Sequence, residues 1–113
     1  MSMGPAGLPS PVILQGTFTG TGASSSCEVW GNFNVTLGGT WAGSVQVERS
    51  FDDGATWTVV AVDGAGNPAI YTSPISLVGQ EIEVGADYRL NCTVFTSGTV
   101  RYRIAVPQYR GRF

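Results

Sequence analysis

Short segments of strict apolar and polar alternation, separated by glycine-rich turns, limit most strongly how this chain can fold. Phe33, Val35 and Leu37 occupy one parity, and Asn34 and Thr36 occupy the other. The same period of two recurs in the segments 44–49, 57–62, 81–84, 88–94 and 99–106. A period of two is the side-chain repeat of a β-strand. The sequence therefore predicts an all-β protein, an antiparallel β-sandwich or jelly roll of about seven to eight short strands.

The alternation also predicts which side chains face the core. Val45 and Val47 are expected to point inward, with Glu48 on the outward face of the same strand. Glu81 and Glu83 share one parity of a later strand, where they are expected to form a solvated outer face.

Length and composition predict a single domain with three regions. The chain has 113 residues, of which 42% are hydrophobic and 12% charged, so it suits one folded core and not a disordered tail. We expect an extended arm at 1–12, rich in proline and glycine, a β-domain at 13–107 and a basic aromatic tail at 108–113. No apolar run approaches the roughly 18 residues of a membrane span, so no membrane association is expected. The arm also lacks the pattern of an export signal.

The residue types present argue against catalysis. The chain contains no histidine and no lysine, which removes the usual general base and the commonest metal ligand. No phosphate-binding loop or nucleophile with a neighbouring base is evident. We therefore expect no enzymatic activity, no metal and no cofactor.

One local motif is complete. Residues 50–57 fit the Ser-x-Asp-x-Gly-x-Thr-Trp pattern called an Asp box, formed by Ser50, Asp52, Gly54, Thr56 and Trp57. An Asp carboxylate that accepts backbone N–H groups, a glycine with positive φ and a tryptophan packed beneath the loop would make a hairpin. Asp boxes recur in sialidase-type propellers and other carbohydrate-active proteins, but those repeat the motif blade by blade. A structural hairpin is the favoured interpretation, and a ligand role for the aspartates is the alternative.

Cys27, Trp41 and Cys92 follow the order found in immunoglobulin domains, where a disulfide packs on a core tryptophan. Leu90 stands where those domains have a tyrosine, two residues before the second cysteine. We expect reduced thiols, with a disulfide as the alternative.

The charge layout suggests binding surfaces at both ends of the chain. Every acidic residue lies between Glu28 and Asp87, whereas five of the six arginines lie from Arg89 onward. The candidate partner-binding residues are Pro5, Pro9, Pro11, Arg101, Arg103, Tyr109, Arg110, Arg112 and Phe113. Arginine with interleaved tyrosine is typical of protein interfaces. We favour a protein partner over nucleic acid, because the chain is acidic overall and lacks lysine.

Two stretches, 39–57 and 85–100, carry a resemblance to a family. The first includes Trp41 and the Asp box, and the second begins Gly85-Ala86-Asp87-Tyr88-Arg89-Leu90. Over roughly residues 33–105 the chain resembles small structural proteins of tailed bacteriophages, in particular capsid decoration, cement and staple proteins. The resemblance implies a virion protein on the capsid exterior, assembled in the bacterial cytoplasm, that binds the major capsid protein and forms a homo-oligomer, a dimer or trimer.

Two functions from different classes follow. The first is a decoration protein that cements the shell by bridging neighbouring capsid subunits through the arm and the tail. The alternative is a receptor- or carbohydrate-binding domain of a tail fibre or adhesin, in which aromatic residues such as Trp30 or Tyr71 form a platform for a sugar. A third possibility is a lectin-like module outside any virus.

Overall fold

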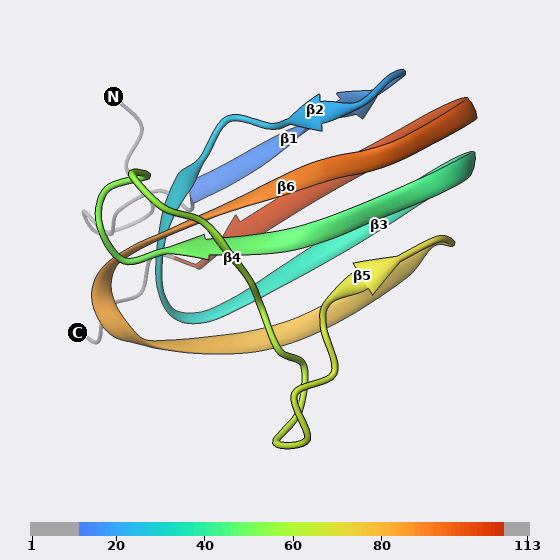
Figure 1. Cartoon of the computed structure of the whole chain (residues 1–113). Coiled ribbons are helices and arrows are strands. Elements are labelled where there is room, and N and C mark those ends of the chain that lie inside the picture. Colours follow the sequence, from blue (N-terminus) through green and yellow to red (C-terminus); the bar gives the residue numbers. More distant parts are fainter. Residues whose placement is uncertain (1–11, 108–113) are drawn as a thin grey trace.

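Two long strands dominate the computed structural model, which describes residues 12–107 (Figure 1). They are β3, Cys27–Ser50, and β6, Ile75–Val106. The shorter strands are β1, Val12–Phe18, β2, Gly22–Ala23, β4, Thr58–Val59, and β5, Ile70–Tyr71. The described residues contain no helix. The prediction of an all-β single domain is confirmed, whereas the count differs: six strands, two of them long, stand where seven to eight short ones were expected.

All pairings between the strands are antiparallel, as predicted, and they form one sheet in the order β1-β6-β3-β4. β2 pairs with β6, and β5 pairs with β3. The strands are fewer and longer because β3 and β6 continue through the glycines that the sequence analysis treated as strand ends. Gly38 and Gly39, for example, stay paired with Arg101 and Val100.

β3 and β6 meet along two separate ladders. Residues 27–37 of β3 pair with residues 75–88 of β6, and residues 34–50 of β3 pair with residues 87–105. Figure 1 shows the two strands folding over together, so that the sheet turns back on itself. The fold brings Val35 and Leu37 into the same buried cluster as Val47.

The core is built from the alternating residues of the long strands. Its largest fully buried side chains include Leu37, Leu90 and Ile104. Two aromatic pairs close it: Phe18 packs on Tyr102 with ring centroids 4.7 Å apart, and Phe33 packs on Tyr88 with centroids 4.9 Å apart. Burial of such side chains is the main source of stability for a domain of this size.

Two expectations about strand faces are wrong. Glu48 and Glu81, assigned to outward faces, are each 5% exposed, whereas Ile82 and Val84 are 91% and 75% exposed. Residues 82–85 have no partner in the ladder, because Val29 pairs with Ala86 and Gly31 already pairs with Glu81. Register shifts of this kind re-aim side chains. The segment therefore directs its apolar side chains to solvent and Glu81 into the protein.

Gly98 of β6 pairs with Trp41 of β3. Its φ is +96°, and a Cβ at this position would overlap the backbone carbonyl oxygen of Thr40. Glycine is required for both reasons. The close approach of the two backbones depends on this residue.

Within residues 12–107, no helix is long and apolar enough to cross a membrane.

Candidate functional site

The Asp-box loop joins β3 to β4 as a hairpin, in which Arg49 pairs with Thr58. Asp52 Oδ1 accepts hydrogen bonds from Ser50 Oγ at 2.7 Å and from the backbone N–H of Thr56 at 2.9 Å. Asp52 Oδ2 accepts one from Thr56 Oγ1 at 2.5 Å, and Ser50 Oγ accepts the N–H of Gly54 at 2.8 Å. Gly54 has a φ of +88°. Both carboxylate oxygens are therefore used to close the loop.

These bonds stabilise the charged form of Asp52. The Thr56 hydroxyl and N–H, followed by the Ser50 hydroxyl, lower the pKa of Asp52 to about 2. The carboxylate is therefore ionised at neutral pH and accepts hydrogen bonds from three groups of its own loop. This geometry makes the loop a structural element.

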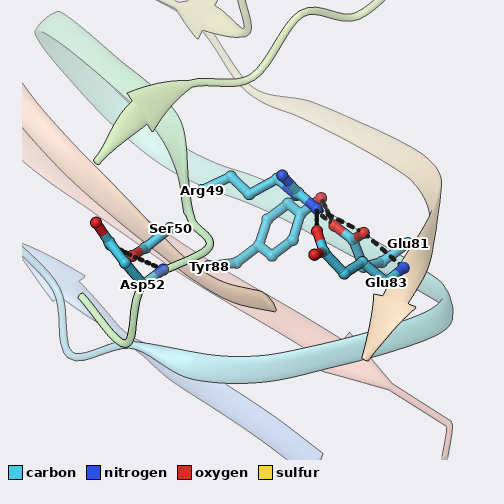
Figure 2. A network of polar contacts seen from close by, with 6 residues as sticks. All are labelled: Arg49, Ser50, Asp52, Glu81, Glu83 and Tyr88. Atoms are coloured by element: carbon cyan, nitrogen blue, oxygen red, sulfur yellow. Dashed lines mark hydrogen bonds and ion pairs between the residues drawn. The ribbon is translucent and has the colours of Figure 1, made fainter. Parts of the chain in front are cut away.

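A second polar cluster surrounds Glu81 (Figure 2). Arg49 donates from Nε to Glu81 Oε1 at 2.5 Å and from Nη2 to Glu81 Oε2 at 2.8 Å, and the Tyr88 hydroxyl donates to Glu81 Oε1 at 2.8 Å. Arg49 Nη2 also contacts Glu83 Oε1 at 2.9 Å. Figure 2 shows Arg49 and Tyr88 converging on Glu81, while Ser50 and Asp52 form a separate group in the loop.

The cluster around Glu81 perturbs three titratable groups. The Arg49 guanidinium, opposed in part by burial and helped by Tyr88, lowers the pKa of Glu81 to about 2. Burial, with the negative charge of Glu81, raises the pKa of Tyr88 well above its ordinary value. Glu81, as a hydrogen-bond acceptor, raises the pKa of Arg49. The Arg49–Glu81 ion pair therefore ties β3 to β6.

Glu48 forms a third cluster, with Arg89. Arg89 Nε donates to Glu48 Oε1 at 2.6 Å, and its guanidinium lies over the Trp57 ring, 4.3 Å from the centroid. Gln46 and Asn91 donate to Glu48 Oε2 at 2.6 and 3.0 Å. Burial raises the pKa of Glu48, but these three donors outweigh it and hold that pKa below its usual value. Arg89 is thus part of the domain's internal structure and not of an exposed arginine cluster.

Arg101 and Arg103 have a different environment. Both are exposed on β6, and no carboxylate of residues 12–107 lies within ion-pair distance of either. They border a shallow hollow of about 380 Å³ that opens on the outer side of the sheet. Its remaining lining is Gln15, Gly16, Thr17, Thr36, Gly38 and Tyr102. We call this surface the arginine face; it places two arginines that have no carboxylate partner among residues 12–107 beside polar side chains.

Arg101 and Arg103 were predicted from the sequence to bind a partner, whereas the other residues of the arginine face were not. Gln15 and Thr17 come from β1, where they pair with Arg103 and Arg101, and Thr36 pairs with Arg103 from β3. No local pattern marks these positions, because only the strand pairing brings them together. The other predicted partner-binding residues, Pro5, Pro9, Pro11, Tyr109, Arg110, Arg112 and Phe113, lie outside the described residues.

An apolar groove of about 470 Å³ lies on another part of the surface. Phe33, Tyr71 and Tyr88 contribute its aromatic lining, and Gln80 adds an amide. Tyr71 is half-buried in this groove, and Trp30 is also half-buried. Trp30 and Tyr71, the two residues considered for a sugar platform, therefore each expose only part of the side chain.

The two thiols are free, with Cys92 buried and Cys27 half-buried. Burial, together with the nearby charge of Asp87, raises the pKa of Cys27 to about 11, so the thiol is protonated at neutral pH. Among residues 12–107 no three His, Cys, Asp or Glu side chains gather closely enough to hold a metal ion.

Comparison with known proteins finds no matching family model, no matching curated protein and no matching solved structure.

Proposed function

We propose that this protein is a non-enzymatic structural protein of a tailed-phage virion, which decorates the capsid and cements it by bridging neighbouring subunits of the major capsid protein. The arginine face carries this proposal. Arg49 and Arg89 are each bound to a buried glutamate, whereas Arg101 and Arg103 are left exposed beside a hollow. Exposed guanidinium groups next to polar side chains suit carboxylates on a partner protein.

We further propose that the folded-over sheet is a β-sandwich of the kind found in such virion proteins. Its supporting feature is the shared core, in which residues from both halves of β3 pack together. A rigid sheet would hold Arg101 and Arg103 at a fixed spacing, because successive residues on one face of a strand are about 7 Å apart.

The first test replaces both arginines. The double variant Arg101→Gln, Arg103→Gln should bind purified shells of the phage that encodes the chain about tenfold more weakly or worse, since each lost charge-assisted contact is worth about 1.5 kcal/mol or more. The matched control Arg101→Lys, Arg103→Lys keeps both charges and should retain most of the binding. Equal binding by the wild type and the glutamine variant would contradict the role of this face.

A second test concerns the two ends of the chain. Deletion of residues 1–11 or 108–113 should leave a folded domain with weaker shell binding, because contacts to several subunits at once would be lost. Undiminished binding by both truncations would show that the ends are not involved.

The number of copies per virion distinguishes a capsid position from a tail position. Hundreds of copies per virion by quantitative mass spectrometry would support the capsid, and a handful would support the tail.

The apolar groove supports the second candidate, a receptor- or carbohydrate-binding domain of a tail fibre or adhesin. The groove is lined by Tyr71 and Phe33 and by the amide of Gln80. Sugars bind to such combinations of aromatic rings and hydrogen-bonding groups. Saturable binding on a glycan array that is lost in Tyr71→Ala would favour this function. Absence of glycan binding together with high copy number would favour decoration.

A further inference from the structure

Among residues 12–107, β1 lies at an edge of the sheet. Its seven residues pair on one side with β6, from Val12 opposite Val106 to Phe18 opposite Val100. On the other side no strand of residues 12–107 pairs with it, and β1 is the end of the strand order. An open edge presents a row of backbone N–H and C=O groups that can pair with another strand.

This edge lacks the features that usually prevent pairing. Residues Val12–Phe18 contain no charged side chain and no proline, and their register with β6 has no bulge. The strands at the opposite end of the sheet are different, since β4 and β5 have two residues each. Residues 75–81 of β6 form a second long edge, since within the described residues they pair only with residues 31–37 of β3. That edge ends in the charged Glu81, whereas β1 has no charged residue.

The sequence of β1 is compatible with itself in an antiparallel pair. Full overlap of two copies places Gln15 opposite Gln15 on the outer face, with Ile13 opposite Thr17. On the inner face it places Leu14 opposite Gly16. No like charges meet. Ile13 is 45% exposed at this edge, so pairing would also cover apolar surface.

Gly16 leaves room for the Tyr102 side chain. The Tyr102 ring lies over it, and a Cβ at Gly16 would come 2.5 Å from Tyr102 Oη. The ring thus fills the space that a side chain at position 16 would occupy.

We propose that β1 pairs with β1 of a second copy of this chain, so that two domains form a two-fold dimer with one continuous sheet. Such an interface is closed, because each copy uses the same strand. The pairing does not depend on the proposed function. It has a consequence for that function, since Arg101 and Arg103 are paired with Thr17 and Gln15. The dimer would carry two such arginine pairs about 14 Å apart, three strand spacings, on one face.

Disulfide trapping tests the pairing directly. In the dimer the two Gln15 Cα atoms would lie about 5 Å apart, within the range that a disulfide spans. The full-length variant Gln15→Cys should therefore form a disulfide-linked dimer under mild oxidation about tenfold faster than Thr99→Cys, a matched exposed position on β6 away from the edge. Cross-linking of Gln15→Cys no faster than that of Thr99→Cys would overturn the proposal.

Opposite charges provide a second measurement. Gln15→Lys places two ammonium groups opposite each other across the two-fold axis, and its dimer dissociation constant by sedimentation should rise about tenfold. An equimolar mixture with Gln15→Glu should restore dimerisation, which a folding defect could not do. An unchanged constant in Gln15→Lys, or dimers that form only after residues 1–11 are removed, would overturn the proposal. Gln15 also lines the arginine face, so shell binding is assayed in the Arg101 and Arg103 variants and dimerisation in the Gln15 variants. An arginine variant that dimerises normally but does not bind shells would separate the two proposals.

Discussion

The guanidinium of Arg49 binds the carboxylate of Glu81 through two hydrogen bonds, although the residues are 32 positions apart. The Glu81 side chain is 4% exposed and that of Arg49 is 30% exposed, so the pair joins β3 to β6 with its carboxylate buried. A buried ion pair contributes little net stability when it is intact, but loss of one partner leaves a charge without compensation.

Arg49→Met should lower the free energy of unfolding by about 3 kcal/mol, because the buried Glu81 carboxylate would lose its cation. Chemical denaturation measures this change. Arg101→Met removes an arginine that has no carboxylate partner among residues 12–107 and should change stability by less than about 0.5 kcal/mol. Similar losses of unfolding free energy in the two variants would show that the ion pair with Glu81 does not make Arg49 more important for stability than Arg101.

The same cluster should make stability depend on pH in acid. The pKa of Glu81 is lowered from 4.5 to about 2 in the folded protein, so its contribution is complete above pH 4.5 and is lost as the pH falls toward 2. The difference corresponds to about 3 kcal/mol of unfolding free energy. Urea unfolding between about pH 5 and pH 2 should show a steeper loss in the wild type than in Glu81→Gln. If the unfolding free energies of the two proteins fell in parallel with pH, Glu81 would not be the source of the acid sensitivity.

Asp52→Ala should loosen the Asp-box hairpin without unfolding the domain. The three groups that donate to Asp52 lose their acceptor, including the backbone N–H of Thr56. We expect a lower melting temperature and faster proteolytic cleavage within residues 51–57. Asp53→Ala is the neighbouring control, although Asp53 has a φ of +58°, which alanine tolerates less well than aspartate. If Asp52→Ala were the milder change of the two, the hydrogen bonds would not hold the loop.

Gly98→Ala should destabilise the fold by about 2 kcal/mol or more, because the added Cβ meets the Thr40 carbonyl and the residue has a positive φ. Gly64→Ala is the matched control in an open loop, where no atom lies within 4 Å of the added group. Its effect should stay within about 0.5 kcal/mol of zero. Thermal unfolding of both variants distinguishes the sites.

Ile82→Thr should leave stability unchanged within about 0.5 kcal/mol, because the side chain is 91% exposed. Val35→Ala, at 1% exposure, should cost about 2 kcal/mol. A large loss in Ile82→Thr would indicate that this segment points inward, as simple alternation suggests.

The alternation of the sequence was sufficient to predict the class of fold. Phe33, Val35 and Leu37 are buried as their parity predicts, because a strand that packs on a core on one side leaves every second residue inside. The Asp-box hairpin was also predictable from the sequence. Its hydrogen bonds join residues only two to four positions apart, namely Ser50, Asp52, Gly54 and Thr56.

Only the tertiary structure decided which polar residues are buried and which arginines are exposed. Glu48 and Glu81 sit on faces that look solvated in the sequence, but Arg89 and Arg49 reach them from strands 41 and 32 residues away. The same long-range pairing engages Arg49 and Arg89 internally and leaves Arg101 and Arg103 exposed beside Gln15 and Thr17. Sequence patterns report the period of a strand, whereas the partner of a charged side chain is set by register between distant strands.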